Sequence, residues 1–266
     1  FLIAYPAYSI VRTAFSADNL TTLDTSFNGF GNFITLFHDS NFWPAVRFTI
    51  VYTVAVVAIE FVLGLTLAIL MDSGLPGRRT LFTACLTPLM IAPALLAIMF
   101  RLLLNHDIGV VPQLARALGF DISLFSPDAV FPLLIALDCI QWTPFVFLIV
   151  YSALQSFPPG ILEAASIDGA SDWKRLIHIT IPMLKPVLYA ALFLRAMEAM
   201  RTFDLIYVLT GGGPGTSTVN ISVFLYKTAF SNGDLGVAAA LSLLIVVVLL
   251  PLIPVISRRL TTGVGE

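Results

Sequence analysis

The sequence predicts an all-α polytopic membrane protein with six transmembrane helices, the first of them truncated at its N-terminus. Of the 266 residues, 58% are hydrophobic and 11% are charged, and the mean hydropathy is +0.93. Soluble domains contain about 25% charged residues, and no soluble core of this length needs so much apolar surface. Long apolar runs separated by polar segments support the same class, because a helix needs roughly 20 apolar residues to cross a bilayer.

The apolar runs place the expected spans in order. Residues 1–15 are too short to cross a bilayer and have no basic leader, so we interpret them as the second half of a first helix rather than a signal peptide. Pro88 and Pro93 are expected to break the third span. The five later spans are expected at residues 43–70, 81–104, 130–151, 187–210 and 235–257. External loops are expected at 17–41, 105–129 (with a short amphipathic segment at 110–118) and 211–234, all within one transmembrane domain covering residues 1–266.

The basic residues predict the orientation of these spans. Seven fall on one side of the expected membrane: Arg78, Arg79, Lys174, Arg175, Lys185, Arg258 and Arg259. The loops of the opposite side contain mainly Asp, together with Arg116 and Lys227. Cytoplasmic loops carry the excess of Lys and Arg, so residues 156–186 are expected in the cytoplasm.

Catalytic and metal sites are not favoured by the pattern of reactive residues. Cys85 and Cys139 lie inside apolar runs and are expected to be small buried residues. The three His residues are in loops without metal-ligand spacing, and the acids of the spans, Glu60, Asp138 and Glu198, lie singly on separate helices. A membrane-embedded enzyme therefore remains only as the alternative from another functional class. The net charge of −2 gives no support for nucleic-acid binding.

A glycine-rich run at residues 211–215 is interpreted as a turn. A phosphate-binding P-loop requires Lys followed by Ser or Thr after its last Gly, whereas Thr216 follows Gly215 here. Any ATP is therefore expected on another subunit.

The charged segment 156–186 reads as two short helices joined by a glycine turn. Pro158 and Pro159 can start the first helix, since proline at the first helical position loses only a donor without a partner. Gly169 supplies the break, and Ser171 or Asp172 can cap the second helix. Pro182 is expected to end it. Such an element suits insertion into a groove on a partner.

Residues of this segment resemble the EAA loop of ABC importer permeases. Glu163-Ala164-Ala165 is followed by Asp168-Gly169-Ala170 and by an ending at Pro182, with Ile181 where Leu is usual. In that family the loop forms the coupling helix that docks into a cytoplasmic ATPase. The resemblance implies the coupling residues Glu163, Ala164, Ala165, Asp168, Gly169 and Ala170. An ordinary cytoplasmic loop is the alternative.

Further motifs resemble the carbohydrate (maltose/glycerol-3-phosphate-type) branch of these permeases. They are a T-x-G-G-P-x-x-x-T element from Thr210 to Thr218, a G-x-A-A-A-x-S helix start from Gly236 to Ser242, and Phe30-Gly31-Asn32-Phe33. Pro112 departs from the branch, which usually has Asn there.

This resemblance implies the type I ABC importer permease fold in a bacterial inner membrane. It implies a second permease subunit, two copies of an ATPase that carries ATP and Mg, an external solute-binding protein, and contact with membrane lipid. No cofactor is expected on this chain. An amino-acid or polyamine importer permease is the alternative within transport.

Two helical faces are the candidate solute site. Asp138, Gln141, Trp142 and Phe145 share one face of the fourth span, and Arg195, Glu198, Ala199 and Thr202 share one face of the fifth. Ionisable residues inside a membrane usually face a cavity or one another, and Trp142 offers a stacking surface for a sugar ring. The resemblance implies sugar contacts from Gln141, Trp142, Phe145, Arg195, Ala199 and Thr202.

Two alternatives accompany this site. Arg195 favours an anionic substituent on the solute, unless Glu198, one turn away, neutralises it in a structural ion pair. For Glu60 and Arg47 the alternative is a structural role, in which they close against the partner permease.

Overall fold

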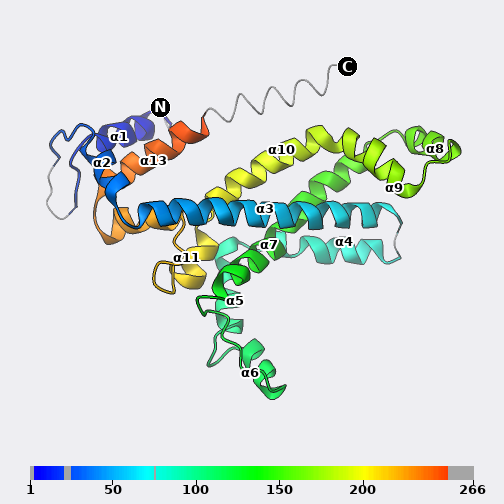
Figure 1. Cartoon of the computed structure of the whole chain (residues 1–266), viewed down its shortest axis with the longest axis horizontal. Helices are drawn as coiled ribbons and strands as arrows, with labels where there is room; N and C mark the ends of the chain where they lie inside the picture. The colour runs from blue at the N-terminus through cyan, green and yellow to red at the C-terminus, as the bar shows by residue number, and fades with distance from the viewer. Residues whose placement is uncertain (1–2, 21–24, 75, 251–266) are drawn as a thin grey trace. The chain divides into compact units, whose positions relative to one another are not determined.

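The computed structural model describes residues 3–20, 25–74 and 76–250. Within these ranges the backbone forms helices and turns (Figure 1), with two isolated bridges, Ser16–Phe27 and Asn19–Asp234, and no longer strand. The all-α prediction is confirmed. The chain divides into two compact units: unit 1 comprises Phe1–Tyr52, Ala94–Leu134 and Met200–Val255, and unit 2 comprises Thr53–Pro93, Ile135–Ala199 and Ile256–Glu266.

Three helical segments of the described chain are long and apolar enough to cross a membrane: α3 (Phe42–Asp72), α7 (Val130–Gln155) and the run Asp172–Thr210. A fourth span is obtained if Arg78–Met90 and Pro93–Leu103 act as one broken helix. The helices at the two ends are shorter, α1 (Ala4–Ala14) and α13 (Leu235–Leu249). The predicted last span, 235–257, continues into residues outside the described ranges.

The third predicted span is broken where its prolines lie. It consists of α4 (Arg78–Leu86), a 3₁₀ turn η1 (Pro88–Met90) and α5 (Pro93–Leu103). Proline lacks the N–H that continues a helix and fits the first helical position, so each of the two begins a new segment. The predicted break is confirmed.

The predicted fifth span, 187–210, is wrong at its start and is interrupted near its end, although the apolar helical run does end at Thr210. Pro182 does not end a helix, because α9 (Asp172–Arg175), the π-helical turn η2 (Leu176–Thr180) and α10 (Ile181–Met200) follow without interruption. The wider hydrogen-bonded ring of a π-turn relieves the clash between a proline ring and the preceding turn. At the other end α10 stops at Met200, and a separate helix α11 covers Asp204–Thr210.

The segments expected as external loops contain short helices. These are α2 (Gly31–His38), α6 (Val110–Ala117), α12 (Ile221–Tyr226) and the π-turn η3 (Lys227–Ser231). Helix α6 confirms the predicted amphipathic segment. The others show that 17–41 and 211–234 are partly helical, which the sequence analysis did not predict.

Small residues hold the core of unit 1 together. Ala14 of α1 packs with Ala239 and Ala240 of α13. A Cβ on Gly236 would lie 2.6 Å from the Ser16 carbonyl oxygen, closer than atoms can approach. The Asn32 side chain donates to the same oxygen at 2.7 Å. The small residues near the start of α13 therefore permit close backbone contact.

In unit 2, α3 and α7 approach each other closely. The core contains Ala68 and Met71 of α3 with Phe147 and Val150 of α7 and Leu184 of α10. A Cβ on Gly64 would lie 2.8 Å from the Val146 Cβ. Because residues four apart share a helix face, the contact at Gly64 also turns Glu60 toward α7.

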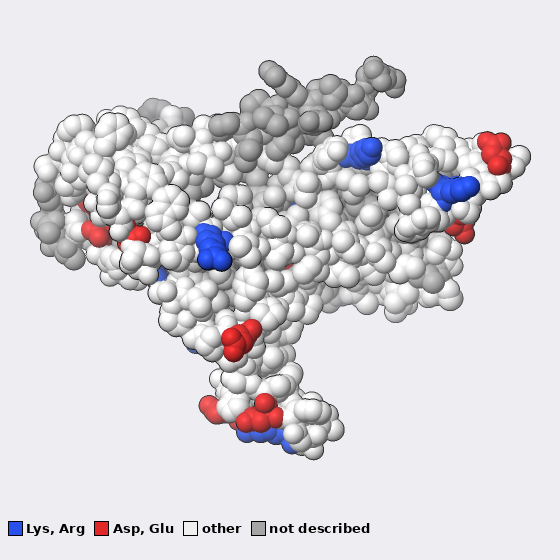
Figure 2. Space-filling model, viewed as in Figure 1, with Lys and Arg blue, Asp and Glu red and all other residues white. Residues whose placement is uncertain are grey.

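Charged side chains are sparse on the face of the molecule that Figure 2 shows. On the face shown in Figure 2, Lys, Arg, Asp and Glu form isolated spots on an otherwise uncharged surface. Val54 and Val62 of α3 are 64% and 66% exposed. In a chain with membrane-spanning helices, lipid or a partner subunit would cover such side chains.

Candidate functional site

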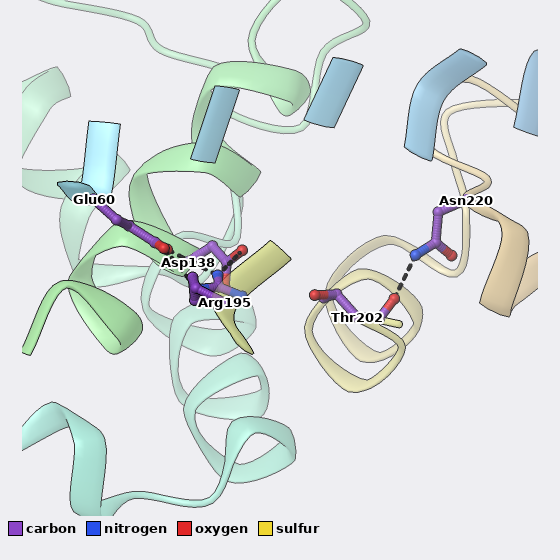
Figure 3. A network of polar contacts seen from close by, with 5 residues as sticks. All are labelled: Glu60, Asp138, Arg195, Thr202 and Asn220. Carbon is purple, nitrogen blue, oxygen red and sulfur yellow. Dashed lines mark hydrogen bonds and ion pairs between the residues drawn. The ribbon is translucent and has the colours of Figure 1, made fainter. Parts of the chain in front are cut away.

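A buried charge cluster joins three helices of unit 2. The Arg195 Nε and Nη2 of α10 donate to the two carboxylate oxygens of Glu60 on α3, at 2.6 and 2.8 Å. Nη2 also donates to Asp138 Oδ2 of α7 at 2.9 Å. In Figure 3, Glu60 and Asp138 both point toward Arg195. All three side chains are at most 1% exposed.

This geometry indicates that the cluster connects helices within the chain. The two bonds to Glu60 form the bidentate arrangement that suits a planar guanidinium, and charge-assisted bonds of this kind are the stronger ones. Charges removed from water need such partners, and removing one typically costs about 3–5 kcal/mol because the other remains buried and uncompensated. The cluster therefore fastens α10 to α3 and α7.

The cluster bears on two expectations from the sequence. Glu60 and Asp138 lie singly on separate helices, as predicted, but their side chains share one guanidinium. Arg195 is neutralised by these two residues, whereas Glu198 is exposed on α10. The contacting residues are 57 and 135 positions apart. No local pattern in the sequence indicates pairs at that separation.

Aromatic rings adjoin the cluster on α7. The Arg195 Cζ lies 5.1 Å from the centroid of the Trp142 ring, a cation–π contact. Trp142 in turn meets Phe145 edge to face, with centroids 6.1 Å apart. Both aromatic residues are half-buried. The structure therefore brings together four of the predicted site residues: Asp138, Trp142, Phe145 and Arg195.

The other predicted solute-site residues lie differently. Gln141 is buried, and its Nε2 donates to the Ile91 carbonyl oxygen at 3.1 Å. Ala199 is buried near the end of α10. Thr202 belongs to unit 1, where its carbonyl oxygen accepts a bond from the Asn220 side chain (Figure 3). Among the described residues, no group of three or more His, Cys, Asp or Glu is placed to hold a metal ion.

The predicted helix–glycine–helix element is present. Helix α8 (Pro159–Ile167) begins at the expected proline and has Asp168 as its C-cap. Gly169 has φ +78°, a left-handed conformation that favours glycine. The Gly169 N–H donates to the Ser166 carbonyl oxygen at 3.1 Å, and the Ala170 N–H donates to the Ala165 carbonyl oxygen at 3.0 Å. These two bonds form a Schellman motif.

The second half of this element is fastened to the first by Arg175. Ser171 caps α9, accepting from the Lys174 N–H at 3.4 Å, which decides between the two predicted caps. Arg175 donates to the Ser166 hydroxyl of α8 at 2.8 Å and also pairs with Asp172. In the sequence, Arg175 indicated only the orientation of the segment, and no local pattern predicted its bond to Ser166.

Two large apolar side chains of the element are largely uncovered in the described part of the chain. Ile167 is 86% exposed and Trp173 is 69% exposed, on either side of the Gly169 turn. Ala164 and Asp168 are also exposed, whereas Ala165 is buried. The Glu163 side chain lies outside the described part. Exposed apolar residues on an otherwise polar loop indicate a surface that a partner covers.

The glycine-rich run closes on itself as a turn, as predicted. Gly211 ends α11 with φ +62°. The Thr218 hydroxyl lies 2.9 Å from that of Thr210 and donates to the Gly213 carbonyl at 2.8 Å. These hydroxyl contacts account for the two threonines of the T-x-G-G-P-x-x-x-T element.

Comparison with known proteins identifies relatives over most of the chain. Residues 60–261 match the family described as binding-protein-dependent transport system inner membrane component. The trehalose/maltose transport system permease protein MalF of Thermococcus litoralis is 36% identical over 226 residues, which cover 84% of this chain and 76% of the relative. The sulfoquinovosyl glycerol transport system permease protein SmoG of Agrobacterium fabrum is 32% identical over 91% of this chain and 79% of its own length.

The fold also matches a solved structure. A bacterial ABC transporter involved in import of the acidic polysaccharide alginate has a chain that superposes with a TM-score of 0.85 and 22% identity, covering 99% of this chain and 91% of that chain. This likeness confirms the predicted type I ABC importer permease fold. From the family match and the identity to MalF, the chain belongs to the inner-membrane components of binding-protein-dependent transport systems and is a multi-pass transport subunit.

Proposed function

We propose that this chain is a permease subunit of an ATP-driven importer for a carbohydrate or sugar derivative. By their names, its relatives carry trehalose and maltose in one case and sulfoquinovosyl glycerol in another. In the proposed assembly, a second permease completes the pathway and an external binding protein delivers the solute. Two copies of an ATPase bind ATP and Mg on the cytoplasmic side, so this chain carries neither.

The observation that carries this proposal is the α8–α9 element with its exposed Ile167 and Trp173. Apolar side chains beside a rigid glycine turn form a compact plug of the kind that enters a groove on a partner. The partner that we propose is the ATPase. Contact with a cytoplasmic ATPase requires that residues 156–186 lie in the cytoplasm.

A continuous helix supports a mechanical connection between this element and the proposed solute site. The run α9–η2–α10 is continuous from Asp172 to Met200, a rod about 40 Å long at the usual helical rise. Arg195 near its far end is fastened to Glu60 and Asp138. Movement of the α8–α9 element would therefore displace α3, α7 and the adjacent Trp142 together. ATP-driven closure would open the pathway outward, and hydrolysis would reset it.

Trp142 and Phe145 are the proposed solute contacts. The ring of Trp142 can stack on the apolar face of a sugar, and Phe145 fixes its orientation from the edge. The Arg195 guanidinium is already paired with two carboxylates, so this cluster does not require an anionic solute. A neutral sugar is compatible with this site.

The test is ATP-driven uptake by the complete transporter in proteoliposomes. We expect uptake of at least one sugar, and loss of both uptake and ATPase stimulation when Trp173 is replaced by Asp. The matched change Ser156→Asp, outside the two helices of the element, should preserve both. Uptake of amino acids or polyamines but of no sugar would favour the alternative importer class. Turnover of a lipid or peptide without any ATPase would favour an enzyme.

A further inference from the structure

Unit 1 contains a cavity of about 540 Å³ that shares no lining residue with the Trp142 site of unit 2. Its walls come from the first turns of α3, the start of α7 and the segment that follows the glycine-rich run. It is lined by Trp43, Pro44, Arg47, Phe48, Val51, Phe131 and Ser217. Small-molecule sites commonly have about 300–1,000 Å³, so the cavity has room for a sugar ring.

Aromatic side chains that pack against one another line part of this cavity. Phe48 stacks on Tyr52 with centroids 5.7 Å apart, and it meets Phe131 edge to face at the same separation. Trp43 is held in place on one side, where its ring stacks on Phe37 with centroids 6.1 Å apart and its Nε1 donates to the Phe37 carbonyl oxygen. The side chain is still 57% exposed, which leaves ring surface for a solute. Ser217 adds a hydroxyl from the segment that follows the glycine turn.

Arg47 gives the cavity its charge. It lies four residues after Trp43, so both side chains project from the same face of α3. Arg47 is exposed, and no carboxylate of the described residues pairs with it, in contrast to Arg195. A guanidinium in an apolar helix is costly unless it faces water, a counter-charge or a ligand.

We propose that this cavity binds an oxyanion-bearing sugar, with a sulfonate, phosphate or carboxylate on Arg47 and the ring on Trp43. The guanidinium fork matches an oxyanion with two bonds, and the indole covers the apolar ring face. This inference rests on the proposed function and deepens it, because it places preference for an acidic sugar at Arg47 rather than at Arg195. The same chemistry would also accept the phosphate of a lipid headgroup, and the experiment separates these sources.

The test measures protection of a cysteine in the cavity. Ser217→Cys is introduced into the full transporter after Cys85 and Cys139 are replaced by Ala, and the rate of maleimide labelling is followed in phosphatidylcholine proteoliposomes. Methyl glucuronide should slow the labelling, and the matched neutral sugar methyl glucoside should do so only at higher concentration. Arg47→Gln should raise the half-protective concentration of the glucuronide about tenfold or more. It should leave that of the glucoside unchanged.

Two controls make the result specific. Arg116→Gln removes an exposed arginine outside the cavity and should preserve protection, and Asp121→Cys should be labelled at the same rate with or without sugar. Equal protection by the two sugars, unchanged protection in Arg47→Gln, or no protection at all would overturn the proposal. Loss of protection when phosphatidylglycerol is added would also overturn it, because a lipid headgroup would then occupy the site. Failure of the proposed function would appear separately, as absence of ATP-driven uptake of any sugar.

Discussion

Arg195 carries a charge that is costly to bury, so its two carboxylate partners determine the effect of replacing it. Arg195→Gln leaves Glu60 and Asp138 buried without a counter-charge, and we expect a loss of about 3–5 kcal/mol in stability. The measurement is the amount and thermal midpoint of the assembled complex in detergent.

A rescue variant separates assembly from solute binding. Combining Arg195→Gln with Glu60→Gln and Asp138→Asn removes all three charges, so it should restore much of the lost assembly. If Arg195→Gln instead assembled at the parental level and lost only uptake of acidic sugars, its guanidinium would serve the solute and the structural role would be wrong.

Trp142 is the residue whose loss should affect solute binding most directly. Trp142→Ala removes an aromatic stacking surface worth about 1 kcal/mol beyond simple area, so we expect KM to rise about fivefold or more. Trp142→Phe keeps a ring and should retain much of the affinity. Uptake kinetics at fixed ATP give the measurement, with assembly checked in parallel because the Arg195 contact is also lost. An unchanged KM in Trp142→Ala would place the solute elsewhere.

For individual residues, the sequence predicted neighbours on one helix but not partners on different helices. The spacing of Asp138, Trp142 and Phe145 placed them on one face of α7, where the structure has them. The partnership of Arg195 with Glu60 depends on how α3 packs, which in turn depends on the Gly64 contact. Pairing by helix packing leaves no periodic signal along the chain.

The α8–α9 element, proposed to couple to the ATPase, depends on the conformation of one residue. Gly169 has φ +78°, and a Cβ there would meet no other atom within 4 Å, so the cost of a side chain is conformational rather than steric. Gly169→Leu should cost about 1–2 kcal/mol locally and disturb the presentation of Ile167 and Trp173. We expect loss of uptake and of stimulated ATPase activity, with the subunit still present in the membrane.

Gly169→Asn is the matched control. Asn tolerates the left-handed region better than Leu, so it should preserve most of the coupling. Normal uptake with normal ATPase stimulation in Gly169→Leu would contradict the coupling role. A defect of equal size in both variants would mean that the proposed partner rejects any side chain at this turn, independently of φ.

Proline illustrates how far local rules predict elements. Pro88 and Pro93 begin new helical segments, as their missing donors dictate. Pro182 has the same chemistry, yet the π-turn before it lets the helix continue into α10. The difference arises from the hydrogen-bonding register of the preceding turn, which the sequence does not reveal.

For the molecule as a whole, composition was the most informative observation. The apolar content predicted an all-helical membrane protein, which the fold and the family confirm. The lengths of the spans were less predictable, because short helices in the connecting segments contribute to the core of unit 1. Orientation remains a prediction from charge, and it decides whether the coupling element can reach an ATPase.

Cysteine labelling from outside intact cells tests the orientation. In a background without Cys85 and Cys139, a membrane-impermeant maleimide should reach Asp121→Cys and Ser217→Cys, which lie in the predicted external segments. It should not reach Ser73→Cys or Asp172→Cys until the cells are opened, because the neighbouring basic residues predict a cytoplasmic location for those segments. The earlier segment around Asp24 is also predicted to be external but lies outside the described residues. Labelling of Asp172→Cys in intact cells would reverse the orientation, and α8 and α9 would then face away from any cytoplasmic ATPase.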